Sequence, residues 1–274
     1  MNQDEILGQK YGDYAGFTTV ASPTEVDHFG EDPLNEVKRL LNIYVRPTSR
    51  ILDIGCGAGQ TLCQFAPQVK EAWGLEQGSD LLAGAQARVR QLGLTNVNLV
   101  AGDITDAEAV DQLPDNYFDV AFTESGPGIN AALVRKLTKA AYFLQEVGGR
   151  YSGYHLPEIM GRVPYTDFAN HYWDQSHLIQ AAEIDLLPVS FKHYFWEVYF
   201  RDLAHLEAYV SKDAELSNWR LAPRPYQAER DRPALELYAR YNTTSKGIRL
   251  LNHIQILVWR RATIHYYPVD GPLE

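Results

Sequence analysis

The pattern of apolar and polar positions changes period several times between about residue 33 and residue 154. Five short, mostly apolar runs are typical of buried parallel strands. These predicted strands are Ile51–Ile54, Ala72–Leu75, Val97–Val100, Phe118–Thr123 and Arg150–Tyr154. Between them, apolar residues recur at helical spacing, as in 61–69, 79–92, 106–113 and 129–145. Strands that alternate with helices predict a parallel sheet that is covered on both faces.

The flanking regions follow other patterns. Residues 1–31 are polar with scattered aromatic residues, and a helix is predicted to follow Asp32 and Pro33, since proline suits the first helical position. Beyond His155 the sequence becomes rich in aromatic residues and is interrupted by prolines. There we expect strands at Phe191–Phe200 and Ile254–Trp259, helices at Asp202–Val210 and Ala234–Tyr241, and a loop at Pro223–Pro233.

Composition narrows the class of protein. The chain has 274 residues, 45% of them hydrophobic and 22% charged, as expected of a globular protein that buries a core. Its formal net charge of −10 disfavours nucleic acid and anionic membranes as partners. Cys56 and Cys63 are the two cysteines, so no disulfide framework is expected, and the N-terminal residues lack the pattern of a secretion signal. We therefore expect a cytoplasmic protein; its oligomeric state, a homo-oligomer included, stays open.

The first predicted strand runs into a glycine-rich turn, Asp53-Ile54-Gly55-Cys56-Gly57-Ala58-Gly59. Glycines between a strand and a helix let the backbone approach a ligand closely, and the helix N-terminus offers unpaired N–H groups. The G-x-G-x-x-G spacing of dinucleotide sites is absent, because its last position would fall on Gln60 or Leu62. An acid at the start of the turn also disfavours a pyrophosphate. The pattern indicates a small ligand that is uncharged or cationic at this point.

The run ILDIGCGAG resembles the first motif of class I S-adenosylmethionine-dependent methyltransferases, and the resemblance extends from about Val45 to His155. It implies S-adenosylmethionine as cofactor and S-adenosylhomocysteine as product. The motif implies that the amino acid part of the cofactor lies against Asp53, Gly55, Cys56, Gly57 and Gly59. Glu76, with Gln77, follows the next strand and is placed to accept from the ribose hydroxyls.

Two further cofactor contacts are implied by the same resemblance. Asp103 and Ile104 follow the third strand, where an acid accepts the adenine amino group and an apolar neighbour covers the ring. Tyr11 and Tyr14 resemble aromatic residues that close the pocket from an N-terminal arm. Acids at three consecutive strand ends are hard to explain by packing alone.

The expected fold is a doubly wound, mostly parallel seven-stranded sheet with helices on both faces and a helical, aromatic-rich cap. Four segments are predicted: an arm and helix (1–45), a Rossmann-like cofactor-binding core (46–156), cap insertions that include a sheet strand near 191–200 (157–246), and a terminal antiparallel strand that completes the sheet (247–274).

Methyl transfer from a sulfonium is an in-line displacement that depends mainly on alignment. Where a proton must be removed, the candidates for catalysis are Glu124 and His155, with His28 and His171 as weaker ones. In the family that the sequence resembles, metal-dependent catechol methylation uses an Asp-Asn pair after the fifth strand. Residues 150–157 supply no such pair, so no metal is expected. The aromatic residues of the cap indicate a small acceptor that is apolar or aromatic; they are Tyr165, Phe168, Tyr172, Trp173, Tyr194, Trp196 and Trp219.

Three alternatives stay open. A nicotinamide-dependent oxidoreductase would use a similar sheet but would need glycine or alanine at Gln60. A member of the fold that binds cofactor without turnover would carry the same motifs. A nucleic-acid methyltransferase is disfavoured, because Glu124-Ser125-Gly126-Pro127 stands where enzymes that methylate base amines usually carry an Asp/Asn/Ser-Pro-Pro-aromatic motif.

Overall fold

The computed structural model describes residues 23–31, 33–124, 126–149, 151, 153, 156–159, 173–212 and 226–263. Within these residues a nine-stranded sheet has the order β1-β7-β9-β6-β5-β2-β3-β4, and β8 pairs with β9. The strands are β1 (Glu25–His28), β2 (Arg50–Ile54), β3 (Glu71–Glu76), β4 (Val97–Ala101), β5 (Phe118–Thr123), β6 (Leu137–Gly148), β7 (Leu186–Phe200), β8 (Thr243–Thr244) and β9 (Gly247–Arg261).

The sheet has a parallel and an antiparallel part. Strands β4, β3, β2, β5 and β6 are parallel neighbours, whereas β9 runs antiparallel between β6 and β7. The expected α/β class is confirmed, and the stretch from β4 to β7 holds seven strands. The predicted count was too low for the whole sheet, because Glu25–His28 is too polar to be recognised as a strand and Thr243–Thr244 is only two residues long.

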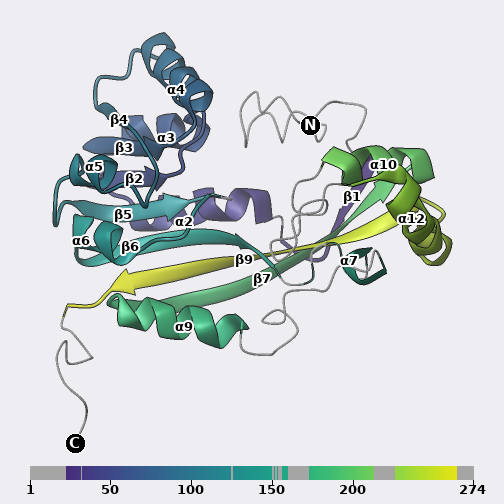
Figure 1. The fold of residues 1–274 in the computed structure, drawn as a ribbon. Helices are drawn as coiled ribbons and strands as arrows, with labels where there is room; N and C mark the ends of the chain where they lie inside the picture. Colours follow the sequence, from purple (N-terminus) through teal and green to yellow (C-terminus); the bar gives the residue numbers. More distant parts are fainter. Residues whose placement is uncertain are drawn as a thin grey trace, which may run out of the picture.

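Helices cover both faces of the sheet (Figure 1). They are η1 (Pro33–Asn35), α2 (Glu36–Tyr44), α3 (Gln60–Phe65), η2 (Ala66–Gln68), α4 (Ser79–Gln91), α5 (Ala107–Asp111), α6 (Ala131–Lys136), α7 (Leu156–Ile159), α9 (Trp173–Glu183), α10 (Leu203–Lys212) and α12 (Ala228–Asn242). Helices α2 and α3 bury apolar side chains against one face, and α5, α6 and α9 do so against the other. Burial of these two faces provides the main stabilisation of the fold.

Strands β7 and β9 are longer than the parallel strands, at 15 residues each. Figure 1 shows them continuing past the parallel strands toward β1, α7, α10 and α12. A third apolar cluster lies there, in which Leu206, Leu235 and Phe200 are fully buried. The antiparallel strands therefore extend beyond the carboxyl ends of the parallel strands, beside the place where α/β sheets bind ligands.

The helix expected over 129–145 and the strand expected over Arg150–Tyr154 were wrong. The helix ends at Lys136, and the fifth parallel strand is Leu137–Gly148. The register between β5 and β6 shifts after the Phe118–Leu137 pair, and Ala140 has a φ of 66°. This irregularity buries both Leu137 and Ala141, four residues apart, so that the strand imitates helical spacing.

The loop expected over Pro223–Pro233 was also wrong, since α12 already begins at Ala228. The carboxylate of buried Asp231 accepts a hydrogen bond of 2.9 Å from the Gln227 N–H, which holds the start of the helix together. Pro233 lies in the second turn and removes only one helical hydrogen bond. Among the described residues, no helix combines the length and apolar character needed to span a bilayer.

Candidate functional site

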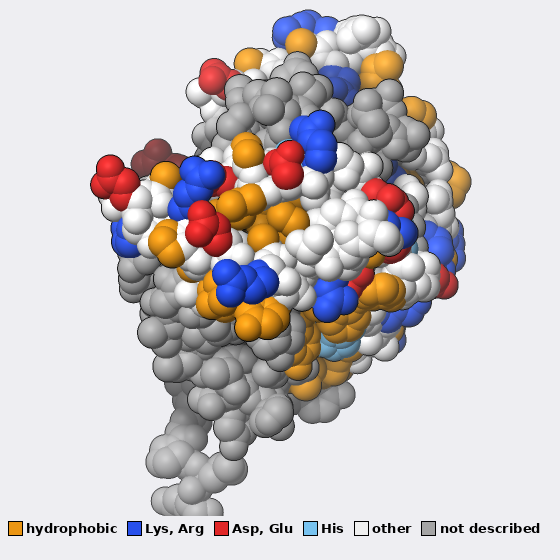
Figure 2. All heavy atoms as spheres, turned by 90° about the vertical axis from the view of Figure 1, so that its right-hand side faces the viewer, with side chains coloured by type: hydrophobic (Ala, Val, Ile, Leu, Met, Phe, Trp, Pro, Cys, Tyr) orange, Lys and Arg blue, Asp and Glu red, His pale blue; other side chains and the backbone are white. Residues whose placement is uncertain are grey.

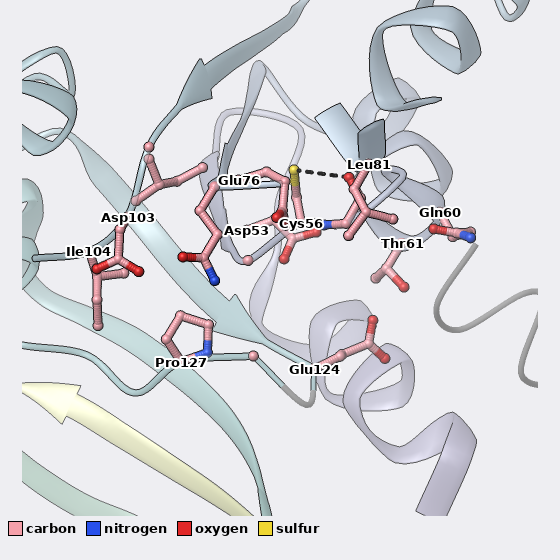
Figure 3. Close-up of a pocket in the computed structure, with 16 residues that line it drawn as sticks. Asp53, Cys56, Gln60, Thr61, Glu76, Leu81, Asp103, Ile104, Glu124 and Pro127 are labelled. Atoms are coloured by element: carbon pink, nitrogen blue, oxygen red, sulfur yellow. Dashed lines mark hydrogen bonds between the residues drawn. The ribbon is translucent and has the colours of Figure 1, made fainter. Parts of the chain in front are cut away.

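A cavity of about 340 Å³ lies at the carboxyl ends of the parallel strands. This volume is within the range of small-molecule sites. Figure 3 shows Asp53, Glu76 and Asp103 facing this hollow, with Glu124 and Pro127 on the opposite side. The lining residues are Asp53, Gly55, Cys56, Gly57, Gln60, Thr61, Leu75, Glu76, Gln77, Leu81, Gly102, Asp103, Ile104, Glu124, Gly126 and Pro127.

The glycine turn between β2 and α3 forms the floor of the cavity. Gly55, Gly57 and Gly59 all have positive φ, at 75°, 54° and 75°. A Cβ on Gly55 would lie 2.8 Å from Pro127 Cδ, whereas a Cβ on Gly57 would meet no atom within 4 Å. Gly55 is therefore required for packing, and Gly57 leaves bare backbone toward the cavity.

Asp53 is the last residue but one of β2 and is only 4% exposed. Burial raises the pKa of its carboxyl well above the usual value, and the nearby Glu124 and Glu76 raise that pKa further. A buried acid beside two other acids favours a ligand that brings positive charge.

Glu76, at the end of β3, is held by the backbone. Its Oε2 accepts from the Gly57 N–H at 2.9 Å, and its Oε1 accepts from the Gly78 N–H at 2.7 Å. Each carboxylate oxygen can accept more than one hydrogen bond. The carboxylate is thus fixed against the glycine turn and retains capacity for two hydroxyl donors of a ligand. Gln77 follows as an exposed residue at the rim.

Asp103 and Ile104 line the cavity beyond β4. Asp103 Oδ1 accepts from the Thr105 hydroxyl at 2.6 Å and from the Thr105 N–H at 2.8 Å, and these bonds lower the pKa of Asp103. Asn130 donates to the Ile104 carbonyl at 2.8 Å, which ties this loop to the start of α6. The loop thus presents an ionised acid next to an apolar side chain.

All the charged side chains that line the cavity are negative. Four of its lining residues are acids, Asp53, Glu76, Asp103 and Glu124. Among the described residues that line it, none is Lys, Arg or His. In a partly enclosed site such an arrangement favours a cation over an anion.

Cys56 also lines the cavity, but its thiol is buried. Burial raises the pKa of this thiol well above its usual value, and Asp53 and Glu76 raise it further. A thiol of this kind is a poor nucleophile. The structure therefore supports a packing role for Cys56 in the turn.

Several predicted site residues cannot be placed in the cavity. Tyr11, Tyr14, His155 and His171 lie outside the described residues. His28 belongs to edge strand β1 and does not line the cavity. Over the part of the chain that the structure describes, no group of three or more His, Cys, Asp or Glu side chains could hold a metal ion.

Several residues that line the cavity were not predicted from the sequence. Gln60 and Thr61 are the first two residues of α3, and Leu81 lies in the first turn of α4. The N-terminal turns of both helices therefore line the cavity. These residues could have been predicted, because ligands in α/β sheets bind at the carboxyl ends of the strands, where the following helices begin. Pro127 was read only as part of a missing motif, and its contact with Gly55 depends on a loop path that no sequence period encodes.

Part of the chain is similar in sequence to known methyltransferases. Residues 46–155, less than half of the chain, match the family model described as a methyltransferase domain. The uncharacterized methyltransferase YcgJ of Bacillus subtilis is 27% identical over 139 residues, which cover 50% of this chain and 53% of that protein. A protein-L-isoaspartate O-methyltransferase of Roseiflexus castenholzii is 32% identical over 110 residues, 39% of this chain and 48% of that protein. The chain spans about half of the length of the curated relatives that it matches.

Solved structures resemble the chain over more of its length. A protein of unknown function from Deinococcus radiodurans has a TM-score of 0.58 at 14% identity and covers 94% of this chain and 96% of its own. A putative methyltransferase from Bacillus halodurans has a TM-score of 0.55 at 17% identity and covers 84% of this chain and 100% of its own. At these identities the likeness concerns the fold alone.

Proposed function

We propose that this chain, whose residues 46–155 match a methyltransferase domain, is a class I methyltransferase that transfers a methyl group from S-adenosylmethionine to a small molecule. The observation that carries the proposal is the convergence of Asp53, Glu76 and Asp103, from three neighbouring strand ends, on one cavity whose floor is a bare glycine turn. S-Adenosylmethionine has the complementary parts: a cationic amino acid end, a ribose diol and an adenine.

Each part of the cofactor is assigned a partner. The amino acid end would lie against Asp53 and the turn at Gly57, where its ammonium and sulfonium charges meet carboxylates. The ribose diol would donate to Glu76, which the backbone N–H groups of Gly57 and Gly78 already orient. Adenine would lie between Ile104 and the Asp103 carboxylate.

The proposed mechanism relies on position and charge. Displacement at the methyl carbon needs the nucleophile, the carbon and the sulfur in line, so the site must hold both reactants in a water-poor space. Glu124 directly follows β5, and its carboxylate is close enough to Asp53 to raise the pKa of that residue. We assign to Glu124 stabilisation of the cationic reacting centre, and His155 stays a predicted proton acceptor.

The acceptor is proposed to be a small molecule with an apolar or aromatic body. Of the aromatic residues on which this expectation depends, the structure describes the side chains of Tyr194, which is buried, and Trp196, which is half-buried. A nucleic-acid acceptor is disfavoured by the net charge of −10. In addition, Figure 2 shows one face on which Lys and Arg are interspersed with Asp and Glu and do not form a continuous basic surface. The proposed compartment is the cytoplasm.

The test is label transfer. The purified protein would be incubated with methyl-labelled S-adenosylmethionine and a cell extract of small metabolites, and the products would be separated by chromatography. We expect label in at least one low-molecular-weight product together with release of S-adenosylhomocysteine. Binding of the cofactor without label transfer to any component would instead support a non-catalytic member of the fold.

A further inference from the structure

Two histidine side chains on neighbouring strands form a hydrogen-bonded pair in the antiparallel part of the sheet. His193 lies on β7 and His253 on β9, and His193 Nδ1 is 3.0 Å from His253 Nε2. The two rings are stacked, with their centroids 5.2 Å apart. His253 is fully buried, whereas His193 is exposed. This histidine pair therefore connects a buried ring to one that can exchange protons with water.

His253 holds the segment Gly149–Gly153, which directly follows β6. The Gly149 N–H donates to the His253 carbonyl oxygen at 2.7 Å, and the Tyr151 N–H donates to His253 Nδ1 at 3.2 Å. The Gly153 N–H donates to another carbonyl of β9 at 2.7 Å. A Cβ on Gly149 would collide with the His253 ring, so the segment passes directly over this ring. Because β6 is parallel to β5, the segment begins at the edge of the sheet where the parallel strands end.

The donors around the histidine pair fix the position of each ring proton. A backbone N–H can only donate, so His253 Nδ1 accepts from Tyr151 and carries no proton. The proton of the neutral ring is therefore on His253 Nε2, which donates to His193 Nδ1. The Gln255 amide nitrogen lies 3.4 Å from the same His193 Nδ1 and is also a donor. His193 thus carries its own proton on Nε2.

A further proton cannot be added to this arrangement without the loss of a hydrogen bond. A proton on His193 Nδ1 would face the proton on His253 Nε2. The two rings keep their hydrogen bond only if the proton of His253 moves to Nδ1, so that Nε2 accepts from the cationic His193. His253 Nδ1–H then faces the Tyr151 N–H, and that bond is lost. Because a hydrogen bond from a cation is about twice as strong as a neutral one, the Tyr151 bond is the one expected to break.

The charged side chains near the histidine pair are engaged with one another. On this face of the sheet, Arg249 Nη1 of β9 lies 3.4 Å from Glu197 Oε1 of β7. Lys192 of β7 belongs to the opposite face, where its Nζ lies 3.4 Å from Glu36 Oε1. The segment contributes the Tyr151 phenol, whose ring is 5.4 Å from the buried imidazole, and α9 contributes apolar side chains. Other described neighbours on this face are Val147, Phe191 and Phe195. Titration of the pair itself is therefore expected to control the Tyr151 hydrogen bond.

We propose that the histidine pair is a pH-sensitive switch, which holds the segment Gly149–Gly153 on β9 while both rings are neutral and releases it when the pair takes up one proton from solvent. Histidine side chains usually change charge between about pH 5 and about pH 8, so the release is expected in this range. The segment leads in sequence to His155, the predicted proton acceptor, and to α7. The switch requires no cofactor and goes beyond the proposed function.

Hydrogen–deuterium exchange tests the switch directly. Exchange of the Tyr151 amide would be followed by NMR from about pH 8 to about pH 5, with correction for the intrinsic pH dependence of amide exchange. We expect the protection of this amide to fall by about tenfold or more on acidification, because its N–H loses its acceptor. The amides of β2 should keep their protection. Constant protection of Tyr151 over the whole range would overturn the inference.

The variant His193→Asn tests the exposed half of the pair. The Asn carbonyl oxygen can accept from His253 Nε2–H as Nδ1 does, but it takes up no proton in this pH range. We therefore expect full protection of the Tyr151 amide at about pH 8 and loss of most of the pH dependence. The matched control is His28→Asn, which replaces an exposed histidine on β1 and should retain the pH dependence of the parent protein. The same pH dependence in His193→Asn as in the parent would count against the histidine pair.

The variant His253→Asn tests the buried half. Its amide oxygen can replace Nδ1 as the acceptor for Tyr151, and no titrating ring remains beside the segment. Circular dichroism would first establish that the variant folds, because His253 is fully buried. In the folded variant we expect protection of the Tyr151 amide that no longer changes with pH, and a transition like that of the parent would overturn the inference. If the variant does not fold, the comparison of His193→Asn with His28→Asn decides.

Discussion

At the scale of single residues, the site consists of acids whose environments differ. Glu76 is oriented by two backbone N–H groups, Asp103 is kept ionised by Thr105, and Asp53 is buried beside other carboxylates. Their identities and order could be predicted because each lies at or just after the carboxyl end of a short apolar strand. Their hydrogen bonds and pKa shifts could not be predicted from the sequence. The hydrogen bonds to Glu76, for example, come from Gly57 and Gly78, which only the folded backbone brings within reach.

Glu76 gives the first prediction. Glu76→Ala should weaken S-adenosylmethionine binding by about 1–3 kcal/mol, because the ribose hydroxyls lose their acceptor and the Gly57 and Gly78 N–H groups lose theirs. Isothermal calorimetry measures this change. The exposed Glu183→Gln serves as control and should match the parent protein. Equal affinities for all three proteins would refute the assignment of Glu76.

Asp53 gives a prediction about pH. Its pKa in the folded protein lies well above the usual value of 3.8, so between these two values the folded state binds more protons than the unfolded state. The free energy of unfolding contributed by Asp53 therefore falls as pH rises through this window. Asp53→Asn should stabilise the cofactor-free protein, and this gain should grow with pH and level off above the window.

Thermal unfolding of both proteins from about pH 3 to about pH 8 measures this gain. Asp103→Asn is the matched control with the opposite sign, because the pKa of Asp103 is lowered by Thr105. That substitution should destabilise the protein at neutral pH, and the loss should shrink only as pH falls to the usual value of 3.8 and below it. A gain for Asp53→Asn that does not change with pH would show that the carboxyl is ionised throughout.

At the scale of elements, the accuracy of sequence prediction followed the regularity of the pattern. The strand at Phe118–Thr123 agrees closely with expectation, because five of its six residues are buried and form one continuous apolar run. The helix at Ser79–Gln91 also agrees with expectation. Strand β6 does not, because the irregularity at Ala140 changes which side chains are buried. The edge strand β1 was missed because pairing with β7, and not its own composition, makes it a strand.

Ala140 tests this explanation of β6. With a φ of 66°, alanine is strained there, so Ala140→Gly should raise the free energy of unfolding by up to about 1 kcal/mol. In the helix that the sequence pattern favours, the same change would lower it by about 1 kcal/mol. Denaturant unfolding measures the sign, and a clear loss of stability would count against the strand.

The glycine turn tests the floor of the cavity. Gly55→Ala should lower stability more than Gly57→Ala by at least about 1 kcal/mol, because only the first would place a Cβ 2.8 Å from Pro127 in addition to the strain of positive φ. Gly57→Ala should mainly reduce cofactor affinity, since its methyl group enters the cavity. Thermal unfolding and calorimetry separate the two effects. Equal stabilities of the two variants, together with an unchanged cofactor affinity of Gly57→Ala, would mean that the glycine turn does not contact the cofactor.

At the scale of the whole molecule, the parallel and antiparallel parts of the sheet differ in their position relative to the cavity. The parallel strands place three acids around the cavity, whereas the longer β7 and β9 continue past the ends of the parallel strands (Figure 1). The parallel part could be predicted because strands and helices alternate in sequence. The extension could not, because it depends on pairings between residues far apart in the chain, such as Tyr194 with Ile254.

The central claim is that the cavity at the strand ends binds S-adenosylmethionine. The most direct measurement is isothermal calorimetry of the purified protein with S-adenosylmethionine, S-adenosylhomocysteine and NADH as separate titrants. We predict saturable binding of the first two at one molecule per chain, weakened in Glu76→Ala, and no binding of NADH. Absence of heat with both adenosyl compounds, or saturable binding of NADH, would contradict the account.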